Sequence, residues 1–214
     1  MKSLKYNLLA LAVLALAITP SFANSIPISG TGAGLGSVHV LDPNYTLIGG
    51  GPLLNLPPQL FTTPPFPGWV AASPGTQWIN PFGDGTVDAP GGTYDYQITF
   101  SLSGLNPLTA ILTGDFAADN SACISLNTVP TGMCTPTVTG FEQLTPFAIS
   151  SGFRPGTNML DFIVTNQDGT STNTPTGLEV EISGTAAAPE PSSLLLIGSG
   201  LLGLAGAVRR RLVG

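Results

Sequence analysis

The stretch YDYQITFSLS, Tyr94–Ser103, decides the fold class of this chain. Its apolar side chains alternate with polar ones from end to end, which is the period of a β-strand with one buried face. Turn-forming Gly, Pro and Asn residues separate four further runs of this kind: Leu108–Leu112, Ala122–Leu126, Leu160–Val164 and Leu178–Ile182. Because all these runs are short and each has one apolar face, we expect an all-β fold in which two antiparallel sheets pack as a β-sandwich.

The composition excludes several other classes of protein. The chain has 214 residues, of which only 8% are charged, with 27 Gly, 20 Pro and a formal net charge of −6. So many helix breakers exclude a coiled coil or a helical bundle. The negative charge and the lack of a basic stripe argue against binding to nucleic acid.

Residues 24–90 differ from the rest because proline punctuates them throughout. Each proline removes a donor from the sheet, so only short or edge strands can form there. We expect a first strand at Ser37–Leu41 and, beyond it, an ordered loop packed on one sheet. The sequence thus predicts a signal peptide at 1–23, this packed segment at 24–90, the β-sandwich at 91–186 and a distinct tail at 187–214.

The N-terminus has the layout of a secretory signal peptide. Lys2 and Lys5 precede the apolar run Leu8–Ile18, and Ser21-Phe22-Ala23 supplies the small residues expected before a cleavage site. We expect a signal helix that is removed after Ala23, so that the rest of the chain is exported.

A second apolar run, Leu194–Val208, precedes the basic triplet Arg209, Arg210, Arg211. Its length is close to the minimum needed to cross a bilayer, which predicts a single transmembrane helix. Arginines directly after such a run stay in the cytoplasm, so the preceding domain would lie outside.

Pro189, Glu190 and Pro191, followed by this apolar run and the arginine triplet, resemble the PEP-CTERM sorting segment of Gram-negative bacteria. The resemblance implies processing by exosortase, a membrane-embedded enzyme. It also implies a precursor anchored in the inner membrane, a mature protein at the cell surface or in the extracellular matrix, and an association with exopolysaccharide. The same tail is found in proteins labelled as ice-binding.

Residues 108–186 also resemble a recurrent ectodomain of PEP-CTERM proteins, with a layout similar to galactose-binding-like jelly rolls. The matching pieces include Gly114–Asn120, Gly152–Asn158 and Leu160–Asn166. Such sandwiches often bind sugar and often hold a structural calcium, so the resemblance implies a jelly-roll-like ectodomain with these two candidate ligands.

Several side chains are candidates for these sites. Asp115, Asp119 and Asn120 supply the hard oxygens that Ca²⁺ prefers, although a turn in which Asp119 and Asn120 bond their own backbone is the favoured interpretation. Trp69 and Trp78 could stack on sugar rings, although core packing is the favoured role for both.

Cys123 and Cys134 are the two cysteines of the chain. The intervening residues can turn back and the compartment is oxidising, so we expect a disulfide between them. Arg154 is the one Lys or Arg between residues 24 and 186, and we expect it to pair with Asp161 or another nearby carboxylate.

Catalysis has little support in the sequence. His39 is the single histidine, and no sequence motif identifies a serine or a carboxylate as its catalytic partner. We therefore expect a non-enzymatic surface or matrix protein without a cofactor, and a lectin-like module is the main alternative. An extracellular hydrolase ranks lower for the same lack of catalytic motifs. An ice-binding protein also ranks lower, because Thr135, Thr137 and Thr139 form only one short threonine rank.

Overall fold

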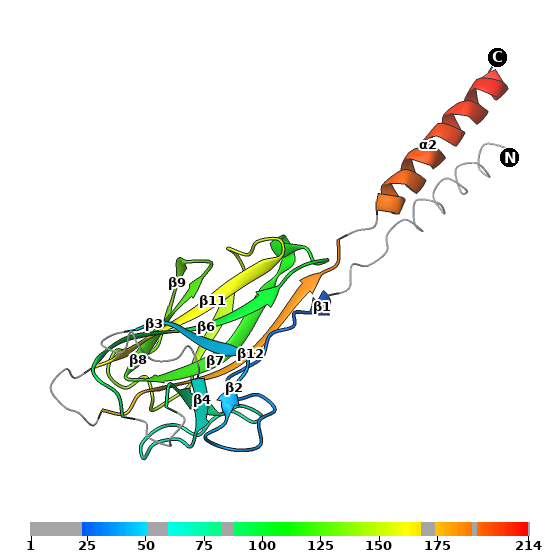
Figure 1. Cartoon of the computed structure of the whole chain (residues 1–214). Coiled ribbons are helices and arrows are strands. Elements are labelled where there is room, and N and C mark those ends of the chain that lie inside the picture. Colours follow the sequence, from blue (N-terminus) through cyan, green and yellow to red (C-terminus); the bar gives the residue numbers. More distant parts are fainter. Residues whose placement is uncertain (1–22, 51–59, 83–87, 168–173, 190–191, 214) are drawn as a thin grey trace. The chain divides into compact units, whose positions relative to one another are not determined.

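The computed structural model describes residues 23–50, 60–82, 88–167, 174–189 and 192–213 (Figure 1). The predicted signal peptide at 1–23 lies almost wholly outside these residues. Residues 24–186 form one compact unit, and residues 187–214 belong to a separate one.

Two antiparallel sheets build the compact unit, which confirms the predicted β-sandwich. One sheet has seven strands in the order β10-β7-β12-β5-β4-β2, with β1 paired to β12, and the other has the order β3-β6-β11-β8-β9. The strands of the seven-stranded sheet are β1 (Ala23–Ser25), β2 (Leu41–Asp42), β4 (Leu60–Thr63), β5 (Trp78–Asn80), β7 (Ile111–Asp119), β10 (Thr145–Ile149) and β12 (Gly177–Ala187). Those of the five-stranded sheet are β3 (Tyr45–Gly50), β6 (Gly92–Ser101), β8 (Ser121–Leu126), β9 (Val129–Cys134) and β11 (Thr157–Asn166).

The core lies between the two sheets and follows the alternation read from the sequence. In β6 every second side chain is buried, from Tyr94 to Phe100. The aromatic rings of Phe116, Phe147 and Phe162 meet across the two layers, with ring centroids 5.7–6.3 Å apart. Burying apolar surface in this way supplies most of the free energy that favours the folded state.

The expectation for residues 24–90 was wrong in two respects. Residues 37–39 are bends rather than a strand, because His39 has a φ of +60° and its amide donates to Thr62 O. The segment also contributes β3 to the five-stranded sheet and β2, β4 and β5 to the seven-stranded one. It therefore belongs to both sheets instead of lying over one.

The predicted strand at Leu108–Leu112 begins later than expected. Asn106 caps a 3₁₀ turn, η1 (Pro107–Thr109), by accepting a hydrogen bond from Leu108 N at 3.0 Å. Proline suits the first position of such a turn, because its fixed φ is helical and its missing N–H is not needed. As a result the Leu108 side chain faces solvent, and β7 starts only at Ile111.

Candidate functional site

Trp69 and Trp78 form a second apolar cluster on the outer face of the seven-stranded sheet, packed on Ala117. Their ring centroids are 4.2 Å apart, and Trp78 Nε1 donates to Val70 O at 3.0 Å. Trp78 has no exposed surface and Trp69 only 8%. Neither ring is presented to a sugar, so core packing accounts for both tryptophans and the proposed stacking role was wrong.

Two carboxylates hold the segment that carries these tryptophans onto the sheet. Trp69 Nε1 donates to Asp119 Oδ2 at 2.7 Å. Glu179 Oε1 accepts from Ser73 N at 3.0 Å and from Thr76 Oγ1 at 2.5 Å. The Glu179 side chain is fully buried, and its Oε2 has no hydrogen-bond partner among the described residues.

Burial governs the electrostatics of these two acids. It raises the pKa of Asp119 to about 6, although the hydrogen bond from Trp69 opposes the shift. Burial also raises the pKa of Glu179, against the hydrogen bonds from Thr76 and Ser73, and the nearby charge of Glu181 raises it further. Burial penalises the charged form of a carboxyl group, so both side chains resist ionisation.

A second pair of acids lies on the outer face of the five-stranded sheet. Asp161 in β11 is buried and accepts from Gln97 Nε2 at 2.8 Å. Asp95 in β6 has a buried Oδ1 without a hydrogen-bond partner among the described residues. Burial and then the charge of Asp161 raise the pKa of Asp95 to about 6.

Two of the three residues predicted to bind calcium already accept hydrogen bonds, and the third lies apart from them along its strand. Asp119 is bonded to Trp69 as described above, and Asn120 Oδ1 accepts from Gln167 N at 2.6 Å. Asp115 lies four residues earlier along β7. Across the described part of the chain, no three His, Cys, Asp or Glu side chains are grouped to hold a metal. The calcium site stays a prediction.

The predicted disulfide is confirmed. Cys123 in β8 and Cys134 in β9 are bonded and stand directly opposite each other in the antiparallel pair. Both side chains are exposed. The bridge therefore closes the β8–β9 hairpin from its solvent side.

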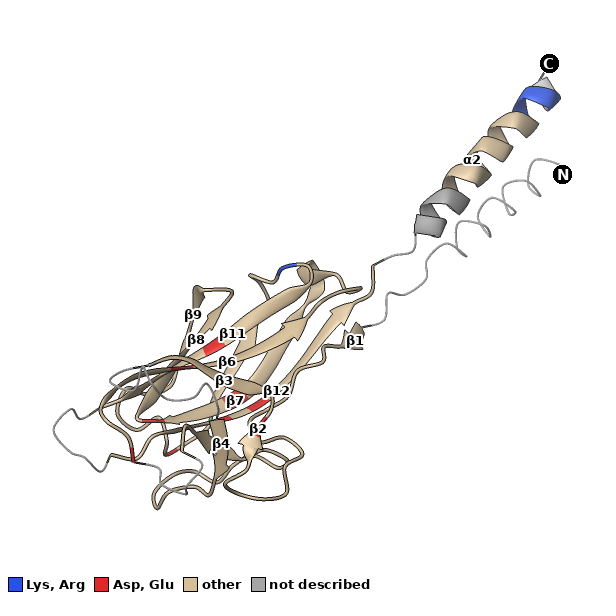
Figure 2. Cartoon of the chain, in the orientation of Figure 1, with Lys and Arg blue, Asp and Glu red and all other residues tan. Residues whose placement is uncertain are grey.

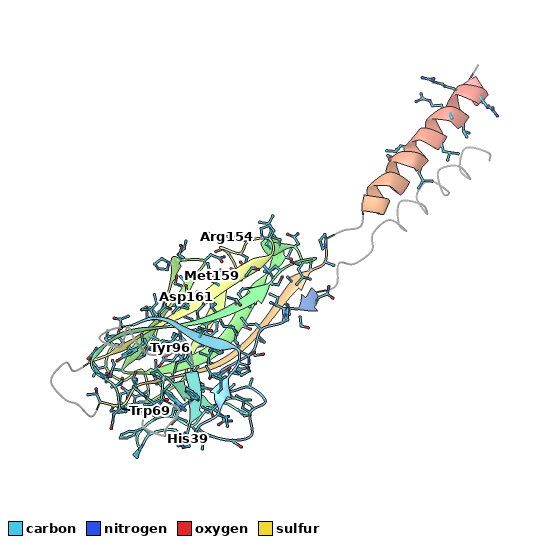
Figure 3. The ribbon with its side chains drawn as sticks, viewed as in Figure 1. His39, Trp69, Tyr96, Arg154, Met159 and Asp161 are labelled. Carbon is cyan, nitrogen blue, oxygen red and sulfur yellow. A yellow bond between two sulfur atoms is a disulfide. The ribbon has the colours of Figure 1, made fainter. Side chains whose placement is uncertain are left out.

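Arg154 does not pair with Asp161, so that prediction was wrong. Its side chain is exposed, and its guanidinium donates to Asn127 O at 3.4 Å. Figure 3 shows why: Arg154 belongs to the loop before β11, whereas Asp161 lies well along that strand. Among the described residues Arg154 has no carboxylate partner.

The remaining candidates for chemistry are separate from one another. His39 is exposed and makes no side-chain hydrogen bond to another described residue. Thr135 is buried, with its Oγ1 accepting from Ala122 N at 2.8 Å, whereas Thr137 and Thr139 are exposed. The three threonines therefore do not form one exposed rank.

The tail follows the compact unit after a short connection. The helix α2 (Ser192–Val213) begins five residues after β12 ends, and Arg209, Arg210 and Arg211 lie in its last turns. This confirms the predicted C-terminal helix. Within the described residues no helix is both long and apolar enough to cross a membrane, so the predicted transmembrane span is not confirmed.

Residues 187–211 match the family model described as the PEP-CTERM protein-sorting motif. The chain carries a PEP-CTERM motif. The match covers the tail and not the sandwich, so it assigns a sorting signal and no activity to the sandwich. Comparison with curated proteins found no match.

Solved structures similar to the chain include three carbohydrate-binding modules. The first is a family 35 module from an environmental isolate, at 11% identity and a TM-score of 0.35, and the match covers 70% of this chain and 96% of that one. A second is CBM35 from Paenibacillus barcinonensis, at 14% and 0.32, covering 69% and 98%. The third is a family 35 module from Clostridium thermocellum, at 11% and 0.34, covering 68% and 95%. TM-scores this low support no argument about ligand or fold.

Sequence reasoning found the PEP-CTERM motif and the disulfide, and it missed the half-buried Asp95 and the buried Glu179. The alternating pattern of β6 gave a signal for Asp95, because it placed this residue on the outer face of its sheet. Glu179 gave none. Its burial depends on the turn Ser73–Thr76, which lies about a hundred residues away in the sequence.

Proposed function

We propose that this chain is the precursor of an exported protein whose β-sandwich is delivered to the cell surface or extracellular matrix of a Gram-negative bacterium. The observation that carries the proposal is the PEP-CTERM motif at residues 187–211, directly after a compact unit that ends at residue 186. A sorting signal placed there can be removed or transferred without disturbing a strand of either sheet.

The chemistry of the tail fits a temporary anchor. The apolar part of α2 enters the inner membrane, and Arg209–Arg211 stay on its cytoplasmic side, since cationic side chains cross a bilayer at high cost. Exosortase then acts on the segment around Pro189–Pro191, outside the membrane. The signal peptide at 1–23 starts this route and is removed first.

The sandwich itself acts as a non-enzymatic component of the matrix, associated with exopolysaccharide. Its surface is acidic and carries one Lys or Arg between residues 24 and 186, which favours solubility outside the cell. A lectin-like role is the alternative. It ranks second because the two tryptophans proposed for sugar stacking are buried.

Fractionation of cells with and without exosortase tests the proposal. We expect the sandwich in the medium or matrix fraction when exosortase is present, and the full-length precursor in the membrane pellet when it is absent. A variant with Arg209, Arg210 and Arg211 changed to Gln should lose this dependence, since the basic end no longer fixes its orientation. The same distribution in both strains would overturn the proposal.

Sedimentation of the released protein with exopolysaccharide from the same cells then tests the matrix role. We expect a fraction of the sandwich to pellet with the polymer and to stay soluble without it. Saturable binding to one defined sugar on a glycan array would favour the lectin-like alternative instead.

A further inference from the structure

We propose that one end of the sandwich is a docking surface for the phospholipid headgroups of the membrane that holds the precursor. We call it the exit-end surface and define it by Leu108, Ile111, Val129 and Arg154. The inference rests on the proposed function, because it requires the tail to be held in a bilayer.

The strand registers place these four residues at the end of the sandwich where β12 finishes. Ile111 stands opposite Thr185, two residues before the end of β12. The loop with Arg154 joins the adjacent strand ends, since Leu102 N donates to Gly156 O at 2.8 Å. The β8–β9 turn before Val129 reaches the same loop, through Asn127 Nδ2 and Gly152 O at 3.0 Å.

The charges of the sandwich are distributed unevenly along its length. The segments that form this end, residues 102–112, 126–134 and 149–160, contain no Asp or Glu. They do contain Arg154, the single Lys or Arg of residues 24–186. Figure 2 shows this one blue position at the end where β12 finishes, with the red positions along the strands and toward the other end. The exit end is therefore the part of an acidic unit that an anionic surface repels least.

The same end exposes apolar side chains. Leu108, in the middle of η1, is 89% exposed, Val129 is 59% exposed and Ile111 is 44% exposed. Single exposed apolar residues are common on protein surfaces. Here, however, they lie at the same end as Arg154, which has no carboxylate partner among the described residues, and apolar side chains together with basic ones are the combination that binds at a membrane interface.

The backbone that carries Arg154 and Leu108 is held in place before any ligand arrives. Asn158 Oδ1 accepts from Arg154 N at 2.8 Å, and Asn158 Nδ2 donates to Arg154 O at 2.8 Å. Asn127 Nδ2 donates to Asn158 Oδ1 at 2.9 Å, and both asparagines are buried. Asn106 fixes η1 in the same way. Docking thus costs little backbone ordering.

The connection to the tail limits how far this end can move from the membrane. Four residues separate Ala187 from Ser192, and the five Cα–Cα steps that join them span about 17 Å when fully extended. A tether this short keeps the exit end at a high effective concentration near the lipid headgroups. Charge, exposed apolar surface and tether length therefore favour the same occupant, an anionic phospholipid surface.

The test uses the precursor left after signal-peptide removal, residues 24–214, in vesicles of phosphatidylethanolamine and phosphatidylglycerol. Leu108→Cys carries an environment-sensitive fluorophore, and a headgroup spin-labelled lipid acts as quencher. Val138→Cys is the control, because Val138 is also an exposed apolar residue, 59% exposed, and lies in a loop bonded to Asn120 at the other end. We expect at least twofold stronger quenching at position 108 than at position 138.

Arg154→Gln tests the electrostatic part. One Lys or Arg near an anionic leaflet contributes about 1 kcal/mol, so this change should shift the docked-to-free ratio about fivefold in the phosphatidylglycerol vesicles. It should have little effect in vesicles of phosphatidylcholine alone.

A third labelled position separates the two ways in which the experiment can fail. Leu204→Cys reports whether α2 enters the bilayer, through quenching by a lipid that carries its spin label deep in the acyl chain. No quenching at position 204 would overturn the membrane-held tail and with it the proposed function. Quenching at position 204 with equal signals at positions 108 and 138 would overturn the docking surface alone.

Discussion

Tyr94 and Tyr96 bury their rings in the same core, but only one hydroxyl group has a partner. Tyr94 Oη donates to Pro90 O at 2.6 Å, whereas the Tyr96 hydroxyl is buried without a hydrogen bond among the described residues. Burial raises the pKa of Tyr94 to about 12 and that of Tyr96 further still. Both hydroxyls therefore stay protonated, and the two residues form a natural pair for comparing a satisfied donor with an unsatisfied one.

Tyr96→Phe should leave the free energy of unfolding unchanged or raise it by about 1 kcal/mol, because it removes a buried polar group that gains no hydrogen bond. Tyr94→Phe should lower it by about 1 kcal/mol, since it removes a formed bond and leaves Pro90 O with fewer partners. Urea denaturation of both variants measures the difference. Equal destabilisation of the two variants would contradict the arrangement in the core.

Asp119 predicts how stability depends on pH. Its pKa is about 6 in the folded protein and about 3.9 in an unfolded chain, so the folded state binds more protons between these values. The contribution of Asp119 to the free energy of unfolding is fully present below about pH 4. It is lost as the pH rises through 6, and the total loss is about 2–3 kcal/mol. The free energy of unfolding should therefore fall between pH 4 and pH 7.

Asp119→Asn keeps an acceptor for Trp69 and removes the charge, so the slope of stability against pH should become smaller. A residual slope of the same sign should remain, because burial also raises the pKa of Asp95 and of Glu179. Glu142→Gln removes one exposed carboxylate and serves as the matched control for the loss of a negative charge. An Asp119→Asn slope as steep as that of the parent would contradict the assignment.

At the scale of single residues the sequence could not distinguish these roles. Trp69 and Trp78 are suited to both a sugar site and a core, and only the segment that covers the seven-stranded sheet decides between them. The charge of Arg154 predicts a carboxylate partner, but it does not say where in the fold the side chain lies. Arg154 lies in a loop without a nearby carboxylate because of the strand registers, which local sequence does not encode.

The disulfide is the clearest element-scale feature, because it closes the β8–β9 hairpin. Changing Cys123 and Cys134 together to Ala should lower the free energy of unfolding by about 2–3 kcal/mol, since the unfolded chain regains the freedom of this loop. Urea denaturation with and without a reducing agent checks the value. The reductant should weaken the parent and leave the double variant unchanged, and a parent that does not respond would contradict a stabilising bridge.

Among the elements, the strands with strict alternation were predictable and those between prolines were not. β6, β8, β11 and β12 overlap the expected runs, because each buries one face and the pattern is visible locally. β3 was not predicted, although Tyr45 and Leu47 alternate with Thr46 and Ile48, because the prolines that follow this strand are typical of a loop. Leu108 fits the alternation, yet Asn106 and Pro107 make a capped turn there instead.

At the scale of the whole molecule, the sequence predicts the route of the chain better than the role of its sandwich. The order of Pro189–Pro191, apolar run and arginine triplet can be read without a structure, and the match at residues 187–211 confirms it. The role of the sandwich depends on which side chains its two sheets expose. That is a property of tertiary structure, and one fold can host many activities.

The central claim is that the chain is cut at both ends on its way out of the cell. Intact-mass measurement of the protein from cells with and without exosortase tests this most directly. The account predicts a product that starts at Asn24 in both, and that lacks or has exchanged the residues after the Pro189–Pro191 segment only where exosortase is present. A polypeptide that still ends at Gly214 in both kinds of cell would contradict it.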